Sequence, residues 1–257
     1  KVFKIGETTI NRDALEEFLR TLGADEWMDK QAWHKAGSHE EYDASAALIE
    51  IAGRACYKSF GVGLNPNITR IREESKEYLA NVLLKGDGSI FEHSGASWAF
   101  VDCSRVFTHE LVRHRAGVAI SQESLRYVRP RELRMTLVPG SELSLLKNLD
   151  EMTRALEAIE KEYFRFANEM IRPEMKFDAK KAWTSALRRM LPDGIATNVV
   201  WSANPRTLRW VLEMRYVFDK VGQILKRDHP MIYQDFERIP HEDGVGAEWV
   251  PKIRSKV

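Results

Sequence analysis

The stretch on which the interpretation of this chain depends runs from Arg113 to Arg129 and reads R-H-R-A-G-V-A-I-S-Q-E-S-L-R-Y-V-R. Arginines, a histidine, hydroxyls and a side-chain amide surround a short apolar insert, A-G-V-A-I. Such a segment can hold an anion, act as an acid/base centre or form an exposed polar surface. The remainder of the chain narrows these three possibilities.

The bulk composition is that of an ordinary globular protein. The chain has 257 residues, of which 44% are hydrophobic and 30% are charged. This length suffices to bury a substantial core, and the proportions are typical of soluble domains. No internal repeat or low-complexity linker is present. We therefore expect a single domain over residues 1–257, with N-terminal and C-terminal extensions.

Charge and cysteine content exclude several classes of partner. The net charge is only +1, from 39 Lys and Arg against 38 Asp and Glu, so any anion site must be local. No stretch approaches the roughly 18 apolar residues that span a bilayer, and the first residues lack a signal-peptide core. Cys56 and Cys103 do not make a disulfide framework. We expect a cytoplasmic protein with no nucleic-acid and no membrane partner.

Apolar periodicity and capping residues predict more helix than strand. The expected N-caps are Asp43, Ser104 and Asn204, the last with Pro205 at the first helical position. Helices are expected over 11–30, 43–56, 69–84, 105–115, 150–171, 179–190 and 204 to about 216, with a further apolar stretch to 226. Strands are expected over 97–103 and 124–128, a long loop around 130–140, and a polar surface tail from 238. The fold class is therefore α/β or α+β.

The helix expected over 105–115 contains His109, Glu110 and His114. The metalloprotease pattern needs two histidines four residues apart, and these are five apart on different faces, so we predict no metal site. Glu110 shares a face with Arg113, whereas His114 lies on the adjacent, more apolar face. A buried structural ion pair between Glu110 and Arg113 is the alternative to a ligand-binding role.

The loop after this helix supplies Ser121, Gln122, Ser124 and Arg126, with backbone N–H groups freed by Gly117. These groups suit a phosphate, or a uracil-like ring with alternating donors and acceptors. A serine nucleophile with a histidine base is disfavoured, because the chain contains no G-x-S-x-G elbow.

A third segment, N-P-R-T-L-R-W-V-L-E-M-R, runs from Asn204 to Arg215. Leu208, Val211 and Leu212 form an apolar stripe that Arg215 continues at helical spacing. A buried guanidinium needs an anion, a carbonyl-rich ligand or access to water. Neither G-x-G-x-x-G nor Walker A is present, so arginines and side-chain amides would have to form any nucleotide site.

Taken in order, these segments resemble the flavin-dependent thymidylate synthases, the thymidylate synthase-complementing family. The family's marker is R-H-R, seven residues and Ser; here eight residues separate Arg115 from Ser124. F-E-H at 91–93, L-R-R-M-L-P-D-G at 187–194 and the helix at 204–215 are similar to family segments. Order and spacing hold from about 46 to 227.

The resemblance implies a central twisted mixed β-sheet flanked by helices, in a homotetramer whose active sites are shared between subunits. It also implies FAD as cofactor, with NADPH and methylenetetrahydrofolate as co-substrates, and methylation of dUMP at C5 without an enzyme nucleophile. The protein would supply orientation and electrostatics, the cofactor the chemistry. The alternatives are a related C5-methylase acting on UMP or another uridine nucleotide, and a catalytically silent nucleotide-binding protein on the same scaffold.

Matching residue by residue, the resemblance assigns a catalytic role to Arg215, which would stabilise charge as pyrimidine N3 ionises and C5 becomes nucleophilic. Implied substrate contacts are Glu110, Arg113, Gln122, Glu123, Ser124, Leu125, Arg126, Arg188 and Arg215. Implied cofactor contacts are His93, Arg113, His114, Arg115, Gln122, Asn204, Arg206 and Trp210. The chain departs from the family at Trp210, where a His or Asn is usual, and by the extra residue within 116–120.

Overall fold

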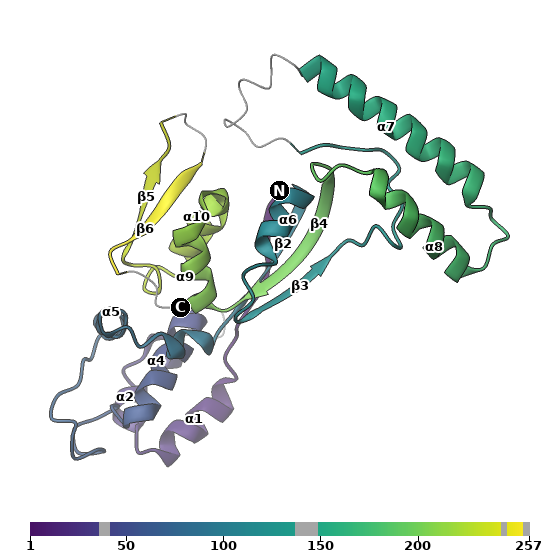
Figure 1. The fold of residues 1–257 in the computed structure, drawn as a ribbon. Coiled ribbons are helices and arrows are strands. Elements are labelled where there is room, and N and C mark those ends of the chain that lie inside the picture. The colour runs from purple at the N-terminus through teal and green to yellow at the C-terminus, as the bar shows by residue number, and fades with distance from the viewer. Residues whose placement is uncertain (36–41, 137–148, 243–245, 254–257) are drawn as a thin grey trace.

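The computed structural model describes residues 1–35, 42–136, 149–242 and 246–253. Figure 1 shows a β-sheet with helices packed along it, and a helical arm that extends away from the sheet. The strands are β1 (Val2–Glu7), β2 (Ala96–Ser104), β3 (Val118–Gln122), β4 (Ala196–Ala203), β5 (Phe236–Pro240) and β6 (Ala247–Pro251). The α-helices are α1 (Arg12–Thr21), α2 (Asp25–Met28), α3 (Ala32–Lys35), α4 (Ala44–Tyr57), α5 (Ser75–Lys85), α6 (Arg105–Leu111), α7 (Leu149–Met170), α8 (Phe177–Leu187), α9 (Pro205–Met214) and α10 (Asp219–Asp228). Short 3-10 turns are η1 (Gly88–Glu92), η3 (Arg188–Met190) and η4 (Tyr216–Phe218).

The main sheet has the order β1-β2-β4-β3, and its three strand pairings are all antiparallel. The predicted α/β (α+β) class is confirmed, but the mixed pairing expected for the sheet is absent from the strands described. The reason is topological. β2 and β3 run parallel to each other, yet β4 lies between them and pairs with both, so no parallel pair forms.

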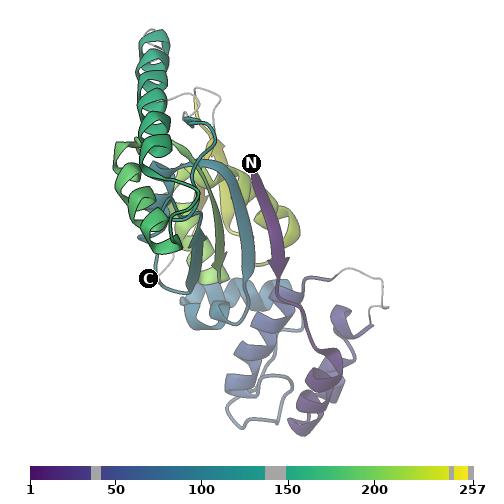
Figure 2. The same cartoon turned by 90° about the vertical axis from the view of Figure 1, so that its right-hand side faces the viewer.

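One face of this sheet carries the core. Trp98 and Trp201 stand opposite each other on β2 and β4 and are fully buried. They belong to an apolar cluster that also includes residues of α4, α5, α9 and α10, and Figure 2 shows α9 and α10 on one side of the sheet. The other face is more open: Phe3, Ile5 and Val200 are 48%, 55% and 41% exposed.

Local capping chemistry starts the key helices where the sequence predicts. The Asp43 side chain accepts the Ala46 N–H at 2.9 Å to begin α4. The Ser104 hydroxyl caps α6, and the Asn204 side chain accepts the Thr207 N–H at 2.9 Å at the start of α9. These bonds satisfy N–H groups that a helix start otherwise leaves without partners.

Several predicted boundaries are wrong. Residues 124–128 form a turn, closed by N–H donation from Tyr127 and Val128 to the Ser124 carbonyl, and the strand lies earlier, at β3. α6 ends at Leu111 instead of residue 115, and α5 begins at Ser75 instead of residue 69. The sequence analysis predicts neither β1 nor β4. Part of the long loop expected around 130–140 lies outside the described residues.

The C-terminal segment is not a polar surface tail as predicted. β5 and β6 form an antiparallel hairpin that packs against α9 and α10. Trp249 is only 5% exposed and Ala247 is fully buried. The polar residues of the hairpin lie on its outer face, so average composition conceals the buried positions that alternate with them.

Candidate functional site

Arg215 and Glu110 form the link between α9 and α6. Arg215 is the C-cap of α9, and its Nη1 donates to Glu110 Oε2 at 2.9 Å. The predicted alternative pair of Glu110 with Arg113 is therefore replaced by a pair with Arg215, while Arg113 is exposed. Arg215 Nε is buried without a hydrogen-bond partner in the described part of the chain. The guanidinium thus retains an unused donor.

His114 lies beyond the end of α6 and therefore not on the helical face that the sequence predicts. It is 3% exposed, and its ring meets that of Trp210 edge to face, with centroids 4.6 Å apart. Neither ring nitrogen has a hydrogen-bond partner among residues the structure describes. Burial, and then the positive charge of Arg215, lower the pKa of His114, opposed by Glu110. His114 is therefore a neutral imidazole at neutral pH, with one donor and one acceptor unused.

A pocket of about 190 Å³ brings together three of the predicted cofactor residues, Asn204, Arg206 and Trp210. Gly117 stands beside them with φ +65°, and a Cβ at this position would overlap the Asn204 side-chain amide. Arg206 forms an ion pair with Glu92. The next residue, His93, is exposed and does not line this pocket. Arg115 is also exposed.

The predicted nucleotide segment, Gln122–Arg126, begins at the last residue of β3. Gln122 donates to the Thr197 hydroxyl at 3.5 Å. The Ser124 hydroxyl accepts the Arg126 N–H at 3.3 Å, which shapes the turn. Leu125 is half-buried and Arg126 is exposed. Arg188 is exposed in η3, which leads into the start of β4 at this same end of the sheet (Figure 1).

The two halves of the opening segment therefore lie apart. Val118 pairs with Ala203 at one end of β4, whereas Gln122 pairs with Val199. The five residues of β3 span about 16 Å of extended chain. The His114–Arg215 cluster and the Ser124–Arg126 turn therefore lie towards opposite ends of β3.

Cys103 lies in β2 with a half-buried thiol. Burial raises the pKa of the Cys103 thiol to about 11, so the thiol stays protonated at neutral pH. Cys56 is exposed near the end of α4. No group of three or more metal-ligating side chains is found in this part of the chain, nor is any helix there long and apolar enough to cross a membrane.

Several residues near the predicted site carry no signal in the sequence. Glu92 holds Arg206, and Asn198 on β4 holds Glu123 through its side chain. Glu248 and Trp249 of the C-terminal hairpin join Arg215 in lining a pocket of about 340 Å³. These positions are set by strand pairing and long-range packing, for which the sequence carries no local signal.

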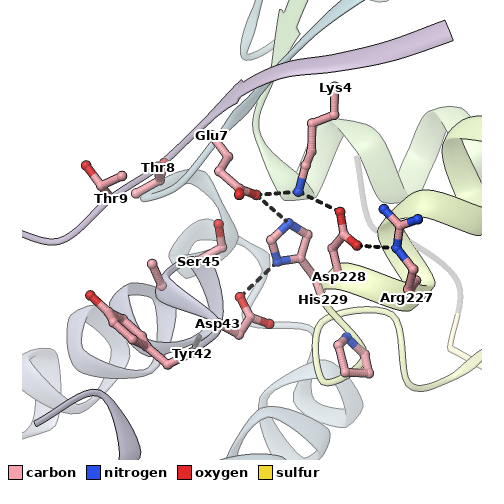
Figure 3. Close-up of a pocket in the computed structure, with 12 residues that line it drawn as sticks. Lys4, Glu7, Thr8, Thr9, Tyr42, Asp43, Ser45, Arg227, Asp228 and His229 are labelled. Carbon is pink, nitrogen blue, oxygen red and sulfur yellow. Dashed lines mark hydrogen bonds and ion pairs between the residues drawn. The ribbon is translucent and has the colours of Figure 1, made fainter. Parts of the chain in front are cut away.

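A larger pocket of about 800 Å³ lies elsewhere and contains none of the predicted site residues. Figure 3 shows a chain of hydrogen bonds and ion pairs along it, from Asp43 through His229, Glu7, Lys4 and Asp228 to Arg227. Hydrogen bonding from Arg227, with a contribution from Lys4, lowers the pKa of Asp228 to about 2. Because these polar groups pair with one another, we interpret the cluster as a structural connection between β1, α4 and α10.

The family model and the similar sequences point to the same family. The model of the family described as thymidylate synthase complementing protein matches residues 40–221. Flavin-dependent thymidylate synthases from Mycobacteroides abscessus and Mycobacterium tuberculosis are 33% identical over 183 and 180 residues, which is 67% of this chain and 68% of each relative. One from Mycobacterium sp. (strain JLS) is 29% identical over 228 residues, covering 82% of this chain and 87% of that relative.

Two solved structures share the fold. The UMP/dUMP methylase PolB from Streptomyces cacaoi, bound with 5-Br dUMP, matches 74% of this chain and 88% of its own, with TM-score 0.55 and 17% identity. ThyX from Helicobacter pylori, with FAD and dUMP, matches 74% of this chain and 93% of its own, with TM-score 0.50 and 16% identity. At these identities the likeness supports the fold alone.

Proposed function

This chain belongs to the thymidylate synthase complementing protein family, and on that premise we propose that it is an FAD-dependent thymidylate synthase that methylates dUMP at C5 to give dTMP. In this proposal methylenetetrahydrofolate is the carbon donor and NADPH is the reductant. The reaction takes place in the cytoplasm and uses no enzyme nucleophile, which agrees with a Cys103 thiol that remains protonated.

The single observation that carries the proposal is the set of unused polar atoms around His114. Both ring nitrogens of this buried histidine and the Nε of Arg215 lack partners within the described ranges. Buried polar atoms in folded proteins nearly always have a partner, so these atoms are suited to a bound ligand. The carbonyl and N–H groups of an isoalloxazine or a pyrimidine have the complementary hydrogen-bonding pattern.

The residues present fit a flavin in chemical type. Asn204, Arg206 and Trp210 line one pocket and would hold it through an amide, a cation and an aromatic surface, with His114 behind Trp210. Bound flavin would supply the redox equivalents and the transfer of the one-carbon unit. The contribution of the chain is to hold these groups in place and to exclude water from them.

Arg215 is the residue to which we assign catalysis. Its guanidinium carries a fixed positive charge, and Glu110 orients it from one side. A cation held against the pyrimidine stabilises the negative charge that develops when N3 ionises and C5 becomes nucleophilic. Glu110 and Arg113 would contact the nucleotide on this side, while Arg115 and His93 would reach the flavin.

The separation of the two half-sites supports a shared active site. The pocket at Asn204 is about 190 Å³, below the 300–1,000 Å³ typical of ligand sites. The Gln122–Arg126 segment and Arg188 lie at the other end of β3. We propose that a homotetramer brings the nucleotide-holding segment of one subunit to the His114–Arg215 cluster of another.

Absorption spectroscopy tests this function directly. The purified protein should be yellow, and NADPH should bleach it and be oxidised in the presence of dUMP. Absence of flavin binding would overturn the proposal. Nucleotide binding without NADPH oxidation would favour the catalytically silent alternative instead.

The choice of nucleotide needs a separate measurement. Release of tritium from C5 of labelled dUMP, compared with labelled UMP, distinguishes a thymidylate synthase from a methylase of UMP or another uridine nucleotide. We expect release from dUMP to be faster. Faster release from UMP would replace dUMP as the substrate without affecting the flavin assignment.

A further inference from the structure

Asn198 lies on β4, and both the nitrogen and the oxygen of its side-chain amide form hydrogen bonds. Its Nδ2 donates to Glu123 Oε2 at 2.8 Å, and its Oδ1 accepts the Asp102 N–H at 3.1 Å. Its backbone carbonyl also accepts the Glu123 N–H at 2.9 Å. One residue therefore connects β2, β4 and the segment that follows β3.

The side-chain amide satisfies both of these contacts because it carries a donor and an acceptor. The Glu123 carboxylate can only accept and the Asp102 N–H can only donate, so residue 198 must present one donor and one acceptor. An aspartate would place a second negative charge at hydrogen-bond distance from Glu123. An alanine would leave the Glu123 carboxylate free to rotate.

Asp102, whose N–H donates to the Asn198 side chain, is itself held in an unusual backbone conformation. Asp102 has φ +55°, within an irregularity of β2 between Phe100 and Cys103. Arg134 pairs with the Asp102 carboxylate at 2.9 Å, and the Thr136 hydroxyl donates to its carbonyl at 2.9 Å. Non-glycine residues adopt positive φ only when their surroundings hold them there. Contacts from Arg134 and Thr136 thus hold Asp102, the residue whose N–H donates to the Asn198 amide.

Glu123 directly precedes the Ser124–Arg126 turn. We propose that Asn198 is a positioning residue for the nucleotide: it fixes the Glu123 carboxylate and, through it, the orientation of the turn. This inference rests on the proposed function, which assigns that turn to the phosphate and pyrimidine. Holding the carboxylate against Asn198 also keeps its negative charge from rotating freely beside the site of a nucleotide anion.

Substitution of Asn198 tests the proposal in the full-length flavoprotein. Asn198→Asp should raise the Kd and the KM for dUMP about tenfold, the lower end expected for a lost hydrogen bond to a charged group. Flavin content, melting temperature and kcat should change little. The matched control is Ser202→Ala, on the same strand and face, which loses only a contact with the Ser97 hydroxyl at 2.7 Å.

A double variant tests whether Asn198 acts through Glu123. In Asn198→Asp/Glu123→Gln the donor and acceptor exchange places, so dUMP affinity should return to that of Glu123→Gln alone. Asn198→Ala should weaken binding in the wild-type background and have no further effect in Glu123→Ala. If Asn198→Asp does not fold, Asn198→Ala in the two backgrounds still tests the proposal.

Three results would overturn the positioning role. These are unchanged dUMP binding in both Asn198 variants, an equal loss in Ser202→Ala, and no recovery in the exchanged pair. Failure of the proposed function is a different outcome, because wild-type protein would then show no dUMP binding in the same titration.

Discussion

Arg215 Nη1 lies 2.9 Å from Glu110 Oε2, so one ion pair joins the C-terminal ends of α9 and α6. The two side chains are 35% and 49% exposed, and pairs this accessible contribute only about 0–1 kcal/mol to stability. The importance of the pair is therefore geometric: it directs a permanent positive charge beside a buried, neutral His114.

Arg215→Ala should abolish methylation of dUMP while leaving the protein folded, because the lost pair contributes little to stability. NADPH oxidation and dTMP formation measure the activity, and the visible spectrum and melting temperature report flavin binding and folding. Arg215→Lys, which keeps the charge and loses the planar fork, is the control and should retain part of the activity. Normal turnover in the Ala variant would refute the catalytic role.

The lowered pKa of His114 predicts a loss of stability in mild acid. Above pH 6.5, its ordinary pKa, the imidazole is neutral in both folded and unfolded chains and has no effect. Below that pH the unfolded chain takes up a proton that the folded chain resists, so the free energy of unfolding falls as the pH falls.

Urea unfolding between pH 5 and 8 measures this dependence. His114→Phe keeps an aromatic ring against Trp210 but cannot titrate, and its stability should fall less over the same range. Parallel profiles for the wild type and the variant would contradict a buried neutral His114.

Gly117→Ala should damage the start of α9. Both positive φ and the overlap of the new Cβ with the Asn204 amide oppose the substitution. Gly63→Ala is the matched control, since Gly63 has φ +91° and open space around the added Cβ. Strain alone costs about 1–3 kcal/mol at either position. We expect Gly117→Ala to lose about 1 kcal/mol more, the typical contribution of an N-cap, and equal melting temperatures would contradict this.

The chain of hydrogen bonds and ion pairs in Figure 3 predicts a stability effect at Asp43. Its Oδ1 both caps α4 and lies 2.8 Å from His229 Nδ1. Asp43→Ala removes both contacts and should lower the free energy of unfolding by about 1–2 kcal/mol. Asp43→Asn keeps an oxygen for the cap and should lose clearly less. An equal loss in both variants, measured by urea unfolding, would show that the carboxylate charge and not the cap is what matters.

Much of the local structure was predictable because its causes are local. Asp43, Ser104 and Asn204 start helices through bonds to residues three positions ahead, and such bonds can be read from the sequence. The apolar stripe that ends at Arg215 likewise predicted the buried face of α9. The family resemblance rests on segments of the same kind.

The strands were harder to predict, because pairing partners are distant in sequence and intrinsic strand preference is weak. β1 is held by β2, about a hundred residues later, and β4 by strands on both sides. The C-terminal hairpin forms because Trp249 is buried against α10 and donates to Asp219 at 3.0 Å.

By itself, the sequence determined the family and the starts of α4, α6 and α9, and it supplied the residues that we propose meet the nucleotide and the flavin. Only the tertiary structure decided that Arg215 pairs with Glu110, that His114 is buried without partners in the part described, and that Asn198 holds Glu123. It also placed the two halves of the Arg113–Arg129 stretch at opposite ends of β3. The reason is physical: chemical type and short-range capping belong to individual residues, whereas these contacts depend on which distant elements the core brings together.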